Sequence, residues 1–360
     1  MNDAILKLTK QLMKISSTKD DAEALSAALD IVKKELQGYY PIEEYESQGI
    51  KSLLIHNTTH RTKHFKIILN AHVDVVTGTK KQFSPLEKDG KLYGRGSYDM
   101  KAATAVMVIL FKQLAKKISY PLALQVVTDE ETGGLNGTHY QVKEGLRGDF
   151  VITGDCGSNL NIVNQAKGIM WLKLHSSGRK AHGAYLWRGD NALWKLHHAL
   201  AALHKIFPVP SEEKWVTTMN LAKIETDNNA FNHVPEGATA YLDFRFIAKD
   251  EKNIMAKIIK AISPDIEIEI MFCNPPEYVA PDNDYLKRLG EMGKKVIGEE
   301  PQLIAAHAPS DIRHYNEVGC VGVGFGPKGA YQHADDEWVD IKSLEEYYYI
   351  LERFLLSLEK

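Results

Sequence analysis

Short apolar runs on either side of a helix-length segment constrain the fold of this chain more than any other feature. "SLLIH" (52–56), "KIILNA" (66–71), "LALQVV" (122–127) and "FVIT" (150–153) are typical of strands buried on both faces of a sheet. Between the second and third runs, "MKAATAVMVILFKQLAKK" (100–117) has the composition and length of a helix. Strand, helix and strand in this order predict an α/β sheet covered by helices.

Both ends of the chain carry the same α/β character. Residues 3–15 place apolar side chains at helical spacing, and residues 21–37 continue with a second predicted helix. Towards the C-terminus we expect a helix over 284–297, the strand "CVGVGF" (320–325) and a final helix over 343–357.

The pattern changes in the middle of the chain. Residues 170–178, 215–226 and 237–248 alternate between apolar and polar side chains, as strands with one exposed face do. Helical segments over 191–207 and 251–262 separate them. This order predicts an α+β sandwich inserted into the sequence of the α/β domain.

A chain of 360 residues is long enough for two hydrophobic cores. We place the α/β domain at 1–170 and 276–360, and the inserted domain at 171–275. With 44% hydrophobic and 25% charged residues, the composition is that of an ordinary soluble globular protein.

Charge and hydropathy exclude several classes of function. A net charge of −3 without a long basic run argues against nucleic-acid binding. No apolar stretch approaches 18 residues, so we expect no membrane span. The lysines among the first apolar residues are unlike a signal peptide, and Cys156, Cys273 and Cys320 are too sparse for a disulfide framework. We therefore expect a cytoplasmic protein.

Ligands of an open α/β sheet bind beyond the carboxyl ends of its strands, so titratable residues there are candidates for a functional site. "LNAHVDVV" (69–76) places His72 and Asp74 two apart on one side of such a strand. A metal-bound His usually donates its other ring N–H to a carboxylate, so the pair suits a metal ligand and its orienting partner. A buried His satisfied by a neighbouring Asp is the alternative.

Three further residues are modest signals when each is taken alone. Asp99 precedes the helix at 100–117 and could be an N-cap, although Gly94 and Gly96 indicate a close-approach loop before it. Asp155 could simply form an Asp-x-Gly turn. His333 lies in a glycine-flanked loop followed by more acids.

The stretch "TDEETGG" (128–134) is harder to explain without a ligand. Asp129, Glu130 and Glu131 follow a strand too apolar to lie at a solvated edge, although a solvated acidic turn is the alternative. Neighbouring carboxylates repel, and a divalent cation would cancel that repulsion. Adjacent residues of a regular strand point to opposite faces, so we expect the strand to break here and Gly133-Gly134 to turn the loop away.

Together, the His, Asp and Glu side chains at these strand ends are the ligands that suit two zinc ions about 4 Å apart with one bridging carboxylate. A remaining Glu would activate water.

Six motifs in order resemble one family over essentially the whole chain. They are "HVDVV", "GRGSYDMKAA", "TDEETGG", "KGIMWLKLHSSGRKAHGAY", "NHVPEGATAYLDFR" and "APSDIRHYNEVGCVGVGFGP…QHADDEWV". The chain is similar to the dinuclear-zinc amidohydrolases and peptidases that include acetylornithine deacetylase, succinyl-diaminopimelate desuccinylase, aminoacylase and carboxypeptidase G. The resemblance implies a zinc-peptidase-like catalytic domain, with the insertion acting as a lid and dimerisation domain.

The resemblance also implies the metal ligands. One zinc ion would be held by His72, Asp99 and Asp155, and the other by Asp99, Glu131 and His333, with Asp99 bridging. Cobalt and manganese are alternative metals. A cis peptide bond between Asp99 and Met100 is a further implication of the resemblance.

Within this resemblance, Glu130 is the general base and acid for a water that bridges the ions, and Asp74 orients His72. We expect Asp129 to form the turn or to support the ligands. Ser310 and Asp311 match the "SD" loop near the family's site.

The resemblance assigns three residues of the inserted domain. His182 matches the lid His that reaches into the partner subunit's active site of a homodimer to stabilise the oxyanion. Asn232 and Arg245 match positions that contact substrate, Arg245 through the substrate carboxylate. Pairing of Arg245 with Asp243 on the same face of the strand is the alternative.

The resemblance implies hydrolysis of the amide bond of a small N-acyl amino acid. Asp155 stands where the deacylases and carboxypeptidases of the family usually have Glu, which favours a dipeptidase or aminopeptidase as the alternative. A non-catalytic binding or scaffold relative is a remote alternative, since all five ligands and Glu130 are present.

Overall fold

The computed structural model describes residues 2–60, 62–155 and 157–359, so Cys156 lies outside the described residues. The chain forms two compact units, and each is described by itself. The first comprises Met1–Gln165, Tyr278–Ala306 and Ser310–Lys360; the second comprises Ala166–Glu277 and His307–Pro309.

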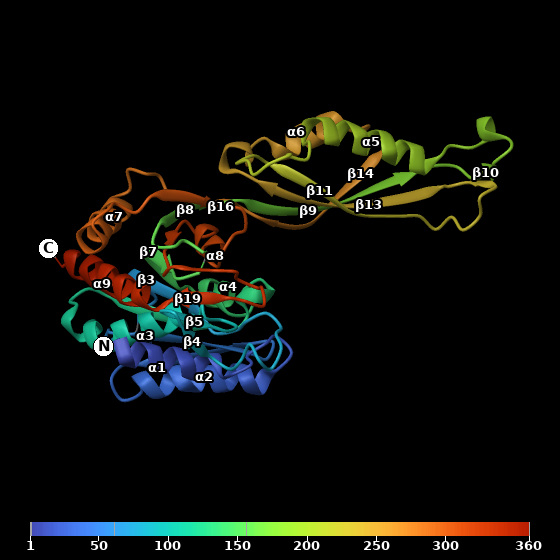
Figure 1. The fold of residues 1–360 in the computed structure, drawn as a ribbon. Coiled ribbons are helices and arrows are strands. Elements are labelled where there is room, and N and C mark those ends of the chain that lie inside the picture. The colour runs from blue at the N-terminus through green and yellow to red at the C-terminus, as the bar shows by residue number, and fades with distance from the viewer. Residues whose placement is uncertain (1, 61, 156, 360) are drawn as a thin grey trace. The chain divides into compact units, whose positions relative to one another are not determined.

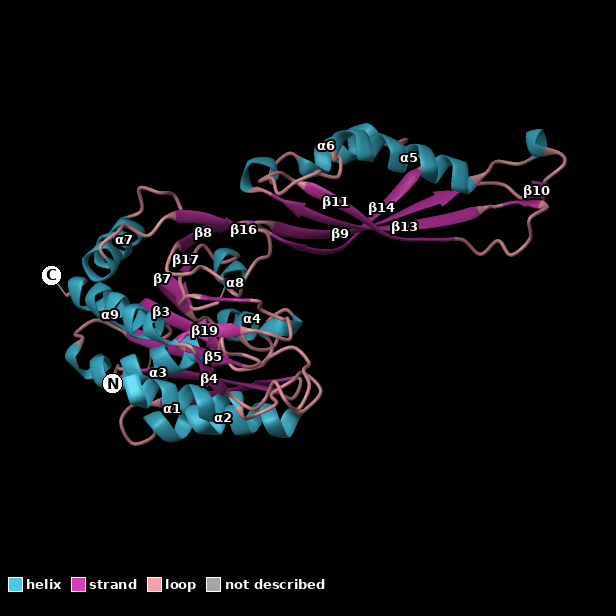
Figure 2. Cartoon of the chain, in the orientation of Figure 1, coloured by secondary structure: helices cyan, strands magenta, loops and turns pink. Residues whose placement is uncertain are grey.

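A mixed sheet is the centre of the first unit (Figures 1 and 2). Its strands are β1 (Ile42–Ser47), β2 (Ile50–His56), β3 (His64–His72), β6 (Leu122–Val127), β7 (Arg147–Thr153), β8 (Ile162–Ala166), β15 (Glu277–Tyr278), β16 (Leu303–Ala306) and β17 (Val321–Gly324). They are ordered β1-β2-β6-β3-β7-β17-β8-β15, and β16 pairs with β8. The four strands β6, β3, β7 and β17 are mutually parallel.

The register of the parallel strands determines where the functional residues lie. His72 pairs with Val127, and Asn70 pairs with Thr153. The carboxyl ends of β3, β6 and β7 therefore lie at one edge of the sheet, as expected for a ligand site in an α/β fold.

Helices cover both faces of this sheet (Figure 1). They are α1 (Asn2–Met13), α2 (Ala22–Leu36), α3 (Lys101–Leu114), α4 (Thr138–Lys143), α7 (Asp284–Ile297), α8 (Ile312–Asn316) and α9 (Ile341–Ser357). Because side chains of a strand alternate, Ile67 and Leu69 of β3 pack into the core under α1, α2, α3, α7 and α9, whereas Ile68 packs against α4 and α8.

A small antiparallel sheet brings two loops of the first unit together. Its strands are β4 (Leu86–Lys88), β5 (Lys91–Tyr93), β18 (Gly329–Ala330) and β19 (Trp338–Asp340). Tyr93 at the end of β5 pairs with Trp338 at the start of β19. The loop that follows Tyr93 therefore lies beside the loop that precedes Trp338.

The second unit is a four-stranded antiparallel sheet with two helices on one face. Its elements are β9 (Gly168–Ser177), β10 (Ala181–His182), α5 (Ala192–Ile206), β11 (Thr218–Glu225), β12 (His233–Val234), β13 (Gly237–Phe246), α6 (Ile254–Ala261) and β14 (Ile266–Asn274). Along β13 every second residue is buried against α5 and α6, because the strand is covered on one face. β10 and β12 form a separate two-stranded pair.

The α/β fold with helical cover is confirmed. The short strands β4, β5, β18 and β19 and the strands β1, β8, β14 and β16 were not predicted. Within the described part of the chain, no helix combines the length and apolar character that crossing a membrane requires.

Candidate metal centre

The Asp99 carboxylate lies between two imidazoles. Its Oδ1 is 3.1 Å from Nε2 of His72, and its Oδ2 is 3.1 Å from Nε2 of His333. Nε2 of His333 is also 3.1 Å from Oε2 of Glu131. Asp99 is therefore placed to share its two oxygens between two separate groups of side chains.

The local backbone explains why Asp99 is available for this position. It follows the loop after β5 and precedes α3, whose N-cap is Met100, without a side-chain capping bond. The interpretation of Asp99 as an N-cap is therefore wrong. The peptide bond between Asp99 and Met100 is cis, as expected.

Two ligand groups form around this carboxylate. His72, Glu130 and Asp155 offer ligand atoms within 4.8 Å of one another, and so do Asp99, Glu131 and His333. Glu130 adjoins His72 and Asp155, whereas Glu131 adjoins Asp99 and His333, because β6 ends at Val127 and a 3-10 turn follows over Glu130–Thr132. The resemblance implies Asp99, and not Glu130, as the third ligand beside His72 and Asp155. The expected break of the strand is thus confirmed, and Gly133 and Gly134 both have positive φ.

The donor set fits divalent metal ions. Imidazole nitrogen and carboxylate oxygen are zinc ligands, and ligand atoms about 2.0–2.1 Å from a tetrahedral zinc ion lie about 3.3 Å from one another. The 3.1 Å separations of His72 and His333 from Asp99 are close to that value. Several carboxylates converge here around two imidazoles, and a divalent cation would offset the repulsion between the carboxylates.

The carboxylates around the two imidazoles make the site favourable to positive charge. Burial lowers the pKa of His72, but hydrogen bonds to Asp74 and Asp99 outweigh burial and raise the pKa well above its usual value. Hydrogen bonds to Asp99 and Glu131 raise the pKa of His333 to about 10. Both rings are thus held by carboxylates that favour a positive charge at their nitrogen atoms.

The pKa values of two carboxyl groups of the site, Glu130 and Asp99, are shifted in opposite directions. Burial and the nearby charge of Asp155 raise the pKa of Glu130 well above its usual value. Burial acts in the same direction on Asp99, but hydrogen bonds from His333 and His72 outweigh it and lower the pKa. Acid–base groups with pKa values pushed apart are typical of catalytic sites.

The sequence predicted that His72 and Asp74 lie on one side of a strand. That prediction is wrong for Asp74, because β3 ends at His72 and Asp74 lies just beyond it. Nδ1 of His72 is 3.0 Å from the backbone carbonyl of Asp74 and 3.5 Å from its Oδ1. The carbonyl is thus the nearer partner of the ring. Oδ2 of Asp74 accepts a hydrogen bond from the backbone N–H of Glu131 at 2.9 Å, so Asp74 also positions the turn.

Asp129 holds the acidic turn in shape, which was one of its two expected roles. Its Oδ2 accepts hydrogen bonds from the backbone N–H groups of Asn136 at 2.8 Å and Gly137 at 3.1 Å. Its backbone carbonyl accepts from Gly134 at 2.8 Å. The side chain is buried, and burial with the charge of Asp311 raises its pKa to about 7.

A buried ion pair that sequence reasoning missed supports the Asp99 loop. Glu337 accepts hydrogen bonds from the backbone N–H groups of Gly96, Tyr98 and Asp99 at 2.9–3.1 Å. Arg95 donates to Glu337 at 2.8 Å and to the carbonyl of His333 at 3.1 Å. The pair therefore joins the loop of Asp99 to the loop of His333.

Asp311 of the expected "SD" loop lies beneath the turn. Its Oδ2 accepts a hydrogen bond from Thr138 at 2.5 Å, and a Cβ built on Gly134 would lie 2.2 Å from its Oδ1. Ser310 accepts from the backbone N–H of Ile312 at 3.3 Å. Asp311 supports the turn from the side of α4 and α8.

The sequence model of peptidase family M20/M25/M40 matches residues 68–357, well over half of the chain. The chain belongs to this family. It is therefore a metal-dependent hydrolase, and the two ligand groups are candidates for the metal site of an M20 peptidase.

Relatives and solved structures of this family match most of the chain. A succinyl-diaminopimelate desuccinylase of Wigglesworthia glossinidia brevipalpis is 28% identical over 327 residues, 81% of this chain and 85% of the relative. A probable carboxypeptidase of Emericella nidulans is 27% identical over 314 residues, 78% of this chain and 72% of the relative. The crystal structure of aminopeptidase PepT from Bacillus cereus has a TM-score of 0.80 at 18% identity and covers 100% of this chain and 99% of that chain.

The second unit of this M20 protein contains the other candidate residues. His182 in β10 pairs with His233 in β12, and the carbonyl of Asn232 accepts a hydrogen bond from Gly183 at 2.6 Å. His182 and Asn232 therefore lie on neighbouring segments. Both have exposed side chains.

Arg245 pairs with Asp243, and this pairing was the predicted alternative to substrate binding. Its Nε is 3.1 Å from each carboxylate oxygen of Asp243. The guanidinium is partly exposed, and its binding of substrate stays a prediction.

Proposed function

We propose that the protein hydrolyses the amide bond of a small N-acyl amino acid at a dinuclear metal centre. One observation carries the proposal: a single carboxylate, Asp99, lies 3.1 Å from two imidazoles that belong to different ligand groups. Such a carboxylate suits two ions held side by side.

We assign the ions to the residues as the family resemblance implies. His72 and Asp155 serve the first, Glu131 and His333 the second, and Asp99 both. Zinc ions bound there would supply Lewis acidity, which favours deprotonation of water and polarises the substrate carbonyl. The support for zinc is the set of imidazole and carboxylate donors, with cobalt and manganese as substitutes.

Glu130 moves the proton in this proposal. Its carboxylate adjoins His72 and Asp155, and burial raises its pKa, which suits a group that exchanges a proton with water. It takes a proton from the attacking water and returns it to the leaving amine. Asp74 keeps the His72 ring in its orientation through the backbone carbonyl and holds the turn at Glu131.

The second unit supplies the remaining groups in this proposal. His182 from a partner subunit donates a hydrogen bond to the developing oxyanion, and Asn232 contacts the substrate. Arg245 leaves Asp243 to bind the substrate carboxylate. Exposed aromatic side chains of the same unit, including Trp187, Trp194 and Phe231, support a homodimer formed through it, because an isolated subunit would leave them in water.

Asp155 favours a second candidate function. The family's deacylases usually carry Glu at this position, and the shorter Asp is typical of its dipeptidases and aminopeptidases. Cleavage of free dipeptides is therefore the alternative activity. The sparse cysteines favour a reducing, cytoplasmic location for either activity.

A substrate panel tests the proposal. Zinc-supplemented protein is incubated with N-acetyl- and N-succinyl-amino acids and with free dipeptides, and released amine is measured. Preferential hydrolysis of the N-acyl amino acids supports the deacylase, and preferential hydrolysis of dipeptides supports the alternative. Turnover of neither class would overturn both.

A further inference from the structure

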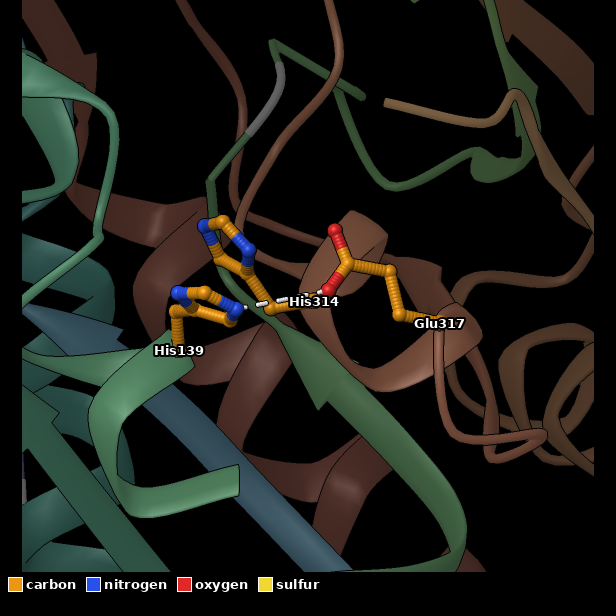
Figure 3. Close-up of side chains that lie close together, drawn as sticks. All are labelled: His139, His314 and Glu317. Carbon is orange, nitrogen blue, oxygen red and sulfur yellow. Dashed lines mark ion pairs between the residues drawn. The ribbon is translucent and has the colours of Figure 1, made fainter. Parts of the chain in front are cut away.

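A second histidine cluster lies in the first unit, outside the candidate centre. It consists of His139 on α4, His314 on α8, and Glu317 directly after α8. The three residues offer ligand atoms within 4.8 Å of one another. Figure 3 shows the two imidazole rings one above the other, with the Glu317 carboxylate beside them.

The tautomer of His314 leaves one nitrogen ready to bind a ligand. Its Nε2 is 2.9 Å from the carbonyl of Gly133, so Nε2 carries the hydrogen and donates it. Its Nδ1 then has a free lone pair. The His314 side chain is fully buried, and Nδ1 has no hydrogen-bond partner among the described residues. A buried polar atom without a partner costs free energy, and a ligand bound at this nitrogen would remove that cost.

His139 and Glu317 stand at the separation that a metal ion needs. Nε2 of His139 is 3.5 Å from Oε2 of Glu317. That distance exceeds the usual N–H···O separation of about 2.9 Å. It is close to the separation of about 3.3 Å between two ligands of a tetrahedral zinc ion. The His314 ring is oriented by the Gly133 carbonyl, as metal-bound histidines usually are by a backbone carbonyl or carboxylate.

We propose that His139, His314 and Glu317 form an additional zinc site, separate from the candidate dinuclear centre. Two imidazoles and one carboxylate leave one tetrahedral position for water. Glu317 and His139 are partly exposed, which gives an ion access from solvent, whereas His314 is the buried ligand.

The site is connected to the catalytic turn through one hydrogen bond. His314 binds the carbonyl of Gly133, two residues after Glu131. An ion that fixes the His314 ring also fixes this carbonyl, and it links α4 to α8 beneath the turn. The proposed role of the ion is thus to hold the turn that carries Glu130 and Glu131.

Metal stoichiometry tests the proposal. Chelator-treated protein is dialysed to equilibrium against zinc chloride, and bound zinc is measured per chain. His139→Gln and Glu317→Gln should each bind about one equivalent less than the unmodified protein. His64→Gln is the matched control, because His64 pairs with one carboxylate, Asp149, on the surface of the same unit and should keep the full amount.

Two further measurements make the result decisive. His139→Gln and Glu317→Gln should also each lose about one equivalent of zinc when they are combined with His333→Ala. This result separates the proposed site from the candidate dinuclear centre, whatever number of ions that centre holds. Zinc should also raise the melting temperature of Glu317→Gln less than it raises that of His64→Gln. We expect Glu317→Gln to fold, because the Glu317 side chain is partly exposed. Equal zinc binding by the unmodified protein, His139→Gln and Glu317→Gln would overturn the proposal.

Discussion

The carboxylate of Glu337 accepts a hydrogen bond from the backbone N–H of Asp99 at 3.1 Å. A residue of the His333 loop thereby fixes the backbone of the candidate bridging ligand. Both Glu337 and its partner Arg95 are buried. The geometry around Asp99 thus depends on a charge pair that contacts no ligand atom.

Replacing Glu337 by Ala should destabilise the protein by about 3–5 kcal/mol, because Arg95 would be left buried without its counter-charge. Denaturant unfolding measures the change in the free energy of unfolding. Arg95→Met combined with Glu337→Leu should recover part of the loss, since it removes both charges. A loss below about 1 kcal/mol for Glu337→Ala would contradict this role of the pair.

Gly134 should tolerate no side chain. A Cβ at this position would lie 2.2 Å from Oδ1 of Asp311, in a residue whose φ is +65°. We expect Gly134→Ala to cost at least about 2 kcal/mol of unfolding free energy, from overpacking added to backbone strain. Gly298→Ala is the control, because Gly298 also has positive φ but has open space around it, and it should cost about 1 kcal/mol.

A double-mutant cycle identifies the cause. In an Asp311→Ala background the clash is removed, so Gly134→Ala should cost less than in the unmodified protein. Equal costs in the two backgrounds would show that Asp311 is not the obstacle.

The buried strands of the first unit were predictable because they lack a polar face. β3, β6 and β7 each contain several successive apolar residues, and the long helix α3 lies between β3 and β6 in the sequence. This order is typical of parallel strands. The strands of the small sheet were not predictable in this way. β4 and β5 have three residues each, and the three residues of β4 are exposed. Neither strand is long enough to show the alternation of apolar and polar residues that identifies a strand.

The ligand groups could be inferred from sequence because their members follow strand ends that the parallel register brings to one edge. The residues that support them could not. Glu337 is one of three successive acids, and nothing local distinguishes it from Asp335 or Asp336. Only the pairing of β5 with β19 brings Glu337 to the loop of Asp99.

Complementation between subunits tests the proposed role of His182. His182→Ala and Glu130→Ala should each be nearly inactive alone. In a mixture, a heterodimer contains one site that has an intact Glu130 and receives His182 from the other subunit. Statistical exchange should therefore restore about one quarter of the normal turnover.

The control mixture combines His182→Ala with the variant that carries both substitutions, and it should stay inactive. Subunit exchange is verified by size-exclusion chromatography with differently tagged chains. If exchange occurs and turnover is not restored in the test mixture, His182 does not act across a dimer.

The adjacent residues Glu130 and Glu131 offer the most direct test of the account, since they differ in proposed role but not in chemistry. Zinc content and turnover are measured together for Glu130→Ala and Glu131→Ala on the best substrate of the panel. Glu130→Ala should keep the zinc content of the unmodified protein and lose at least about 100-fold in kcat. Glu131→Ala should lose about one equivalent of zinc. Near-normal turnover of Glu130→Ala, or loss of zinc from it, would contradict the account.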